Sequence, residues 1–237
     1  MNLENIKPSV RYLAEMDSVI YDREWLENSG DLGLYSMYRD LAENDEDREK
    51  AVKENLRYDI TVMPNMMLGK EYNKTAGHGH PLVLETGLTY PEIYEVLSGK
   101  VIFLLQKISG NEIDNVYAIE AGENDKVIIP PNYEHLMFNI GGKELKTANW
   151  ICRGFTSNIY IGVKEKHGFC YYAVKDDLGK IEWIKNENYA VVPPIKFLGP
   201  NIGLEKFGIS KKEKLYDLIK TPEKLGFLKT PQNYEWK

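Results

Sequence analysis

The sequence has little cysteine and histidine, no long apolar run and no excess of positive charge. Its two cysteines, Cys152 and Cys170, have neither disulfide nor metal-ligand spacing, so we interpret them as small buried apolar residues. No stretch approaches the roughly 18 apolar residues of a membrane-spanning helix, which argues against a membrane partner. Residues 1–7 lack a basic segment followed by an apolar core, so no secretory signal is apparent and we expect a cytoplasmic protein.

The charge balance argues against nucleic acid as a partner. Thirty basic residues stand against thirty-six acidic ones, for a net charge of −6, whereas binding to phosphate backbones requires a basic face. Apolar residues make up 43% and charged residues 28% of the chain, a globular composition that can bury a sizeable core. The length of 237 residues fits one domain with appendages.

The two ends of the chain have helical character. Residues 1–57 are rich in charge, and we predict Asp22 as a helix cap and the charged residues 43–50 as a solvated linker or helix face. In residues 193–237, Ser210 and Glu213 have capping-box spacing, and Thr221-Pro222 is typical of a helix start. We expect this C-terminal segment to cover the barrel or a partner subunit.

The central segment, residues 58–192, predicts an antiparallel sheet. A turn around Ser109-Gly110-Asn111 separates two apolar runs, and Pro130-Pro131 ends another. No long helical pattern lies between the runs to provide parallel crossovers, so a β-barrel or jelly roll is the economical solution. The predicted strands are 58–63, 101–105, 115–120, 126–129, 146–151, 158–163, 169–174, 181–184 and 189–192.

Three of the four histidines suggest a metal site. His78 and His80 have a spacing that places both rings on one face of a strand, although such a pair also occurs on polar strand faces and in loops. Glu92 lies in a strand that runs into a turn at Gly99, and His135 begins another strand after the two prolines. We interpret His167, in a charged turn, as an ordinary exposed residue.

These motifs together resemble a known family. Gly77-His78-Gly79-His80, then Glu92-Ile93-Tyr94, then Pro130-Pro131 and His135 resemble the paired metal-binding motifs of cupins. More closely, the chain is similar to the archaeal-type cupin phosphoglucose isomerases (glucose-6-phosphate isomerases) over roughly residues 8 to 190, with matching motifs from Val10-Arg11 to Gly168-Phe169. It departs from them in the segment 148–153, which lacks the tyrosine usual there, and in a longer loop at 81–90.

The resemblance implies a mainly β cupin barrel and assigns roles by position. It implies a homodimer and one bound divalent ion of iron, manganese, nickel or zinc. The implied metal ligands are His78, His80, Glu92 and His135. The implied phosphate-binding residues are Thr61, Thr75 and Gly77, and the implied substrate-pocket tyrosines are Tyr94 and Tyr160.

The implied activity is the interconversion of glucose 6-phosphate and fructose 6-phosphate in glycolysis and gluconeogenesis. Glu92 is the candidate proton shuttle, because it is the only carboxylate in the ligand set, and Tyr94 is a second candidate catalytic residue. A metal-assisted hydride shift is the alternative to proton transfer. Other reactions on the same scaffold are mannose-6-phosphate isomerisation and iron-dependent dioxygenation, and a non-catalytic sugar- or metabolite-binding cupin is the alternative of another class.

Overall fold

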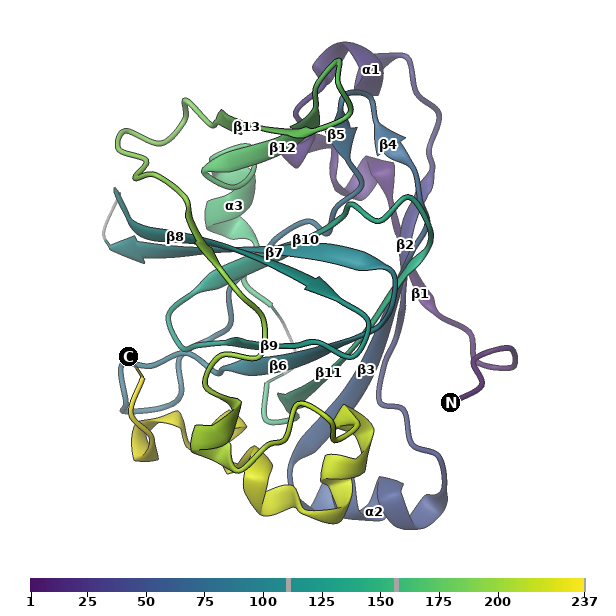
Figure 1. Ribbon diagram of the computed structural model, residues 1–237, viewed down its shortest axis with the longest axis vertical. Helices are drawn as coiled ribbons and strands as arrows, with labels where there is room; N and C mark the ends of the chain where they lie inside the picture. The colour runs from purple at the N-terminus through teal and green to yellow at the C-terminus, as the bar shows by residue number, and fades with distance from the viewer. Residues whose placement is uncertain (110–111, 156–157, 237) are drawn as a thin grey trace.

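The computed structural model describes residues 1–109, 112–155 and 158–236 and is built mainly from β-strands (Figure 1). Its largest sheet is antiparallel throughout and contains strands from the N-terminal segment as well as from the centre of the chain. In order across the sheet, the strands are β1 (Ser9–Tyr12), β2 (Gly33–Tyr38), β3 (Leu56–Met63), β11 (Leu145–Cys152), β6 (Glu92–Ser98) and β9 (Lys126–Ile129).

Two four-stranded sheets complete the β-structure. The second consists of β10 (Glu134–Asn139), β7 (Lys100–Ser109), β8 (Glu112–Gly122) and the parallel edge strand β14 (Lys196–Leu198). The third consists of β13 (Ile181–Lys185), β12 (Tyr171–Lys175), β5 (Glu71–Tyr72) and β4 (Met67–Leu68). β7 and β8 pair antiparallel as expected, and residues 110 and 111 of their predicted turn lie outside the described residues.

The sheets enclose the main hydrophobic core and form the predicted barrel. Val96 and Val127 from the first sheet and Phe103 and Leu136 from the second belong to one buried cluster. In Figure 1 the second sheet lies across strands β6, β9 and β11 of the first. The mainly β fold expected from the alternation of apolar runs and turn residues is confirmed.

The N-terminal segment is less helical than its charge suggested. Helix α1 (Arg23–Glu27) begins as predicted, because the Asp22 carboxylate accepts a hydrogen bond from the Trp25 N–H at 3.0 Å. The charged residues 43–50 enter helix α2 (Asp45–Lys53). However, β1 and β2 extend the first sheet: β2 pairs with β3 and buries Leu34 and Tyr35 in the main core, and β1 pairs with β2.

Two strand predictions in the central segment are wrong. Residues 158–163 lead instead into helix α3 (Ile161–Glu165), which buries Val163 against the core, and 189–192 form no strand. Ile159 forms only an isolated bridge with Gly79. Both segments are rich in residues that favour strands, but that preference reflects packing on a sheet, and no strand of the described ranges includes either segment.

The C-terminal segment packs on the outer face of the first sheet, at the bottom of Figure 1. Leu215, Leu218 and Leu225 are buried against Ile60 and Trp150. The Trp150 indole N–H donates to the Leu215 carbonyl at 2.7 Å. The segment therefore covers the barrel, one of the two arrangements expected for it.

The helices of this segment are 3₁₀ helices. They are η3 (Leu204–Phe207), η4 (Leu215–Lys220), η5 (Pro222–Leu228) and η6 (Pro231–Asn233), and shorter ones, η1 (Leu13–Glu15) and η2 (Asp17–Val19), occur near the N-terminus. η5 begins at Pro222 as predicted. Half of the predicted capping box is present, since the Ser210 N–H donates to Glu213 Oε2 at 3.4 Å, but it starts no helix, and the next helix begins only at Leu215. None of the helices in the described ranges has the length and apolar character of a membrane span.

Candidate metal centre

Four predicted metal ligands converge at the mouth of the barrel. His78 and His135 exchange backbone hydrogen bonds of 3.1 and 2.9 Å in an isolated bridge, which places their side chains together. Glu92 begins β6, and His80 follows two residues after His78. One ligand atom from each of His78, His80, Glu92 and His135 lies within 4.8 Å of the others.

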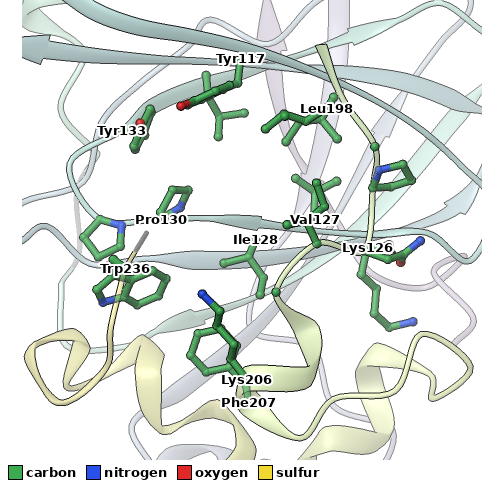
Figure 2. Close-up of a pocket in the computed structure, with 18 of the residues that line it drawn as sticks. Tyr117, Lys126, Val127, Ile128, Pro130, Tyr133, Leu198, Lys206, Phe207 and Trp236 are labelled. Carbon is green, nitrogen blue, oxygen red and sulfur yellow. Dashed lines mark hydrogen bonds between the residues drawn. The ribbon is translucent and has the colours of Figure 1, made fainter. Parts of the chain in front are cut away.

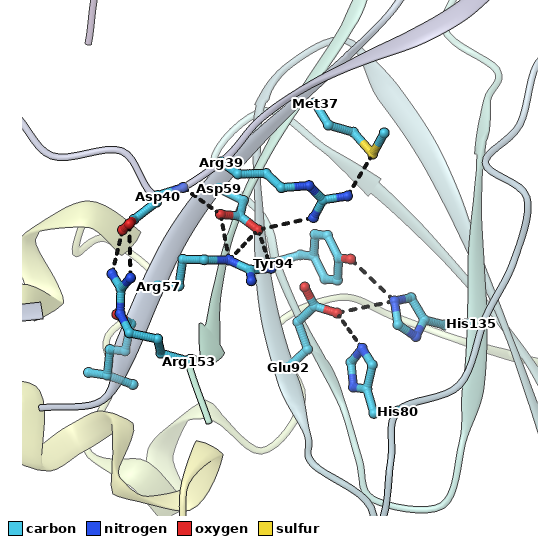
Figure 3. A network of polar contacts seen from close by, with 11 residues as sticks. Met37, Arg39, Asp40, Arg57, Asp59, His80, Glu92, Tyr94, His135 and Arg153 are labelled. Atoms are coloured by element: carbon cyan, nitrogen blue, oxygen red, sulfur yellow. Dashed lines mark hydrogen bonds and ion pairs between the residues drawn. The ribbon is translucent and has the colours of Figure 1, made fainter. Parts of the chain in front are cut away.

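The expected strand at His78 and His80 is reduced to two isolated bridges, His78 with His135 and Gly79 with Ile159. The rings of the two histidines nevertheless lie close together, 5.2 Å apart between their centroids. The His80 Nδ1 atom lies 2.7 Å from the Tyr90 carbonyl, a contact that directs Nε2 toward Glu92. His80 Nε2 and His135 Nε2 lie 3.4 and 3.2 Å from the same oxygen, Glu92 Oε2 (Figure 3).

The electrostatics of the cluster suit metal binding. Burial lowers the pKa of His78 and His135, so both imidazoles are neutral and can offer a lone pair. Burial raises the pKa of Glu92, but contacts with His135 and His80 outweigh it and hold this pKa well below its ordinary value. In the described chain, buried His80 Nε2 and Glu92 Oε2 have no hydrogen-bond partner of acceptable geometry. Three nitrogens and one carboxylate oxygen therefore form a donor set that fits a divalent metal ion.

The cavity beside the cluster contains most of the other predicted site residues. Thr61, Thr75, Tyr94 and Tyr160 line it. The Tyr94 hydroxyl lies 3.2 Å from His135 Nε2, and the Tyr160 ring lies 5.6 Å from the ring of His78. Burial raises the pKa of Tyr94 well above its ordinary value, with a further contribution from Glu92, so this side chain remains a protonated phenol.

Gly77 has a different environment from the other predicted residues. It is not among the residues lining the cavity, and its φ of +78° lies in the left-handed region. A Cβ atom at this position would lie 2.5 Å from the Phe169 ring. The structure therefore explains this glycine by backbone conformation and close packing, which position His78 next to it.

Sequence reasoning missed a polar row in the same cavity. Arg57 and Asp59 alternate with buried apolar residues on β3, and Arg39 follows β2. Asn149, in the segment that lacks the expected tyrosine, also faces the cavity, opposite Asp59 in the pairing of β11 with β3. The period-two alternation of Arg57, Asp59 and Thr61 was the signal that could have identified the row.

A larger cavity, of about 630 Å³, lies elsewhere, between the barrel and the C-terminal segment (Figure 2). Tyr117, Val127 and Tyr133 line it from the barrel, and Phe207 and Trp236 line it from the tail. None of the four candidate metal ligands lines it. The chemistry-bearing side chains therefore identify the smaller cavity as the candidate site.

The barrel and the convergent donor set together define a cupin with a candidate metal centre. The family model described as glucose-6-phosphate isomerase (GPI) matches residues 10–192, more than half of the chain. The chain belongs to the glucose-6-phosphate isomerase family. Among curated proteins, glucose-6-phosphate isomerase of Thermococcus litoralis is 31% identical over 144 residues, which is 60% of this chain and 67% of the relative.

Solved structures are similar to this chain only at a low level. Oxalate oxidase in complex with glycolate is 16% identical, with a TM-score of 0.36 over 46% of this chain and 47% of the other. The formate complex of oxalate decarboxylase from Lactobacillus farciminis is 14% identical, with a TM-score of 0.40 over 54% of this chain and 31% of the other. The chain thus spans less than half of these proteins.

Proposed function

We propose that the protein is a metal-dependent aldose–ketose isomerase that interconverts glucose 6-phosphate and fructose 6-phosphate. The observation that carries this proposal is the convergence of His78, His80, Glu92 and His135 within 4.8 Å, in a chain of the glucose-6-phosphate isomerase family. These four side chains would hold the ion. A bound divalent ion would act as a Lewis acid toward the oxygens of C1 and C2, where negative charge develops.

The side chains around the cluster support roles in proton transfer. Isomerisation requires a base that removes a proton beside the carbonyl and returns it to the neighbouring carbon. We propose Glu92 for this role, since it is ionised, buried and at the centre of the cluster. The protonated phenol of Tyr94 would donate a hydrogen bond to a substrate oxygen.

The phosphate-binding roles of Thr61 and Thr75 are supported by their place in the cavity lining. Thr75 Oγ1 already accepts a hydrogen bond from the Met137 N–H at 3.0 Å, which orients the hydroxyl and leaves its hydrogen available to a ligand. For Gly77 we propose an indirect role, because its conformation sets the path of the chain into His78. Tyr160 is proposed to contact the sugar.

A coupled assay tests the proposal. Protein stripped with a chelator is reconstituted separately with iron, manganese, nickel and zinc, and is assayed with fructose 6-phosphate and with mannose 6-phosphate. We expect turnover of fructose 6-phosphate that is lost on chelation and restored by at least one ion. Full activity after complete removal of metal, or turnover of mannose 6-phosphate alone, would contradict the proposal.

The Glu92→Gln variant tests the proton shuttle. We expect loss of solvent exchange at C2 of the substrate, with substrate binding still measurable by calorimetry. The matched control is Glu134→Gln, which changes a neighbouring, partly buried carboxylate that contacts Gln106 and lies outside the ligand set. Transfer of the C2 hydrogen without solvent exchange in the wild type would instead favour a hydride shift.

Three finer points are part of the same proposal: the identity of the ion, with iron among the candidates, a homodimeric assembly and a cytoplasmic location. The nitrogen-rich donor set supports iron, manganese, nickel or zinc over calcium or magnesium. The metal contained in purified protein, the mass measured by light scattering and the fractionation of native cells test the three points. A place in glycolysis and gluconeogenesis follows from the proposed reaction.

A further inference from the structure

Arg39 is a cation at the candidate site whose hydrogen-bonding capacity is little used. Its side chain is 40% exposed and lines the cavity. Nη1 approaches Asp59 Oδ2 only to 3.6 Å, beyond hydrogen-bond distance, and Nη2 lies 3.0 Å from the Met37 sulfur, a weak acceptor. A guanidinium has five N–H donors, so most of this group is available to a ligand.

The neighbouring Arg57 differs in this respect. Its Nε and Nη2 atoms donate to the Asp59 carboxylate at 2.8 to 3.0 Å, so its charge is compensated in a forked pair. The Asp40 N–H also donates to this carboxylate, at 2.9 Å. Asp59 is therefore held mainly by Arg57 and the backbone, and its attraction for Arg39 is the weaker one.

Strand pairing places Arg39 next to a predicted phosphate-binding residue. Met37 on β2 is the register partner of Thr61 on β3, and the Arg39 guanidinium folds back to contact Met37. In Figure 3 this guanidinium lies above the Tyr94 ring, and Glu92 and His135 lie below the ring.

The charge of the substrate requires such a group. A phosphate ester carries close to two negative charges at neutral pH, since its second pKa is about 6. Threonine hydroxyls donate hydrogen bonds but carry no charge, whereas an arginine fork matches phosphate in both charge and geometry. Among the described lining residues, Arg39 and Arg57 are the cationic side chains other than histidine, and Arg57 is already paired.

We propose that Arg39 binds the phosphate group of the substrate together with Thr61. Asp59, which is itself held by Arg57, positions the Arg39 side chain. The proposal rests on the proposed function and adds to it the cation that selects a phosphorylated sugar. Phosphate binding alone needs no isomerisation, so the two proposals are tested by separate measurements.

The test uses metal-loaded protein with inorganic phosphate as a calorimetric probe and fructose 6-phosphate as substrate. For Arg39→Gln we expect the dissociation constant of phosphate and the KM for fructose 6-phosphate each to rise about 10- to 100-fold, because the variant loses charge-assisted hydrogen bonds to the phosphate group. The kcat should change less than about threefold, because the reacting carbons lie at the ligand cluster. Arg39→Lys should restore part of the affinity, since it keeps the charge and loses the fork.

Arg23→Gln is the matched control, since Arg23 begins α1 and contacts the Asp17 carbonyl instead of the cavity. It should change none of these constants. A phosphate dissociation constant in folded Arg39→Gln, or in Arg39→Met if the former does not fold, within about twofold of the wild type would overturn the proposal. Wild-type protein that binds phosphate through Arg39 and does not isomerise fructose 6-phosphate would refute the proposed function and support the anion site.

Discussion

Removing one candidate ligand should reduce the stabilisation that a bound metal ion gives to the folded protein. His80 is the most informative choice, because its two ring nitrogens have different surroundings. Nδ1 is held by the Tyr90 carbonyl at 2.7 Å. Nε2 points to the cluster, is buried, and has no hydrogen-bond partner of acceptable geometry in the described residues. Glutamine at this position keeps a polar side chain of similar length and removes the imidazole nitrogen. The His80→Gln variant should therefore fold and bind the ion more weakly.

The magnitude follows from mass action. An ion that binds only the folded protein, at 1,000 times its dissociation constant, stabilises it by about 4.1 kcal/mol. For a chain of this length, each kcal/mol raises the Tm by about 2 to 4 °C, so the wild type should gain about 8 to 16 °C. If losing one of four ligands weakens binding about a hundredfold, the same ion concentration contributes only about 1.4 kcal/mol, or about 3 to 6 °C.

Circular dichroism melts with and without the metal measure this difference without reference to activity. The control is His167→Gln, because His167 is the one histidine outside the cluster and contacts the Ser18 carbonyl instead. It should retain the full metal-induced rise in Tm. An equal rise in the wild type and in His80→Gln would refute the reasoning, since the ion would then bind elsewhere.

Three further predictions concern packing and pH. Gly77→Ala should lower the free energy of unfolding by about 2 to 5 kcal/mol in urea titrations, because alanine is strained in the left-handed region and its Cβ overlaps with Phe169. The control Gly87→Ala, at a similar φ of +69° with open space around it, should lose only the part due to backbone strain. Equal losses of unfolding free energy in the two variants would exclude a contribution from the overlap. Trp150→Phe should lower the free energy of unfolding by about 1 to 3 kcal/mol, because the buried Leu215 carbonyl loses its donor; an unchanged urea midpoint would show that this contact does not secure the tail. The hydrogen bond from Arg153 is the main cause that lowers the pKa of Asp40. This partly exposed pair should stabilise the folded protein by about 0.2 to 1 kcal/mol. The stabilisation is present above about pH 4 and is lost as the pH falls through the lowered pKa of Asp40. Asp40→Asn should remove this acid-dependent loss, and identical acid titrations of unfolding for both proteins would contradict it.

The sequence determined the mainly β character and the identity of the four candidate ligands. Apolar runs of period two, interrupted by glycine and proline, predict strands wherever a neighbouring strand is available, and 126–129 match β9 without error. The spacing of His78 and His80, the strand of Glu92 and the prolines before His135 are local features, which is why they could be recognised before the fold was known.

Only the tertiary structure decided which face each polar residue occupies. Arg39 and Asp59 look like ordinary charged residues of a solvated surface, and their place in the cavity depends on the pairing of β2 with β3. The segment 158–163 has strand-forming residues, yet Ile161–Glu165 form helix α3, which buries Val163 in the main core. Local preference is worth a fraction of the energy of burial, so distant contacts, which one-dimensional patterns do not encode, settle these positions.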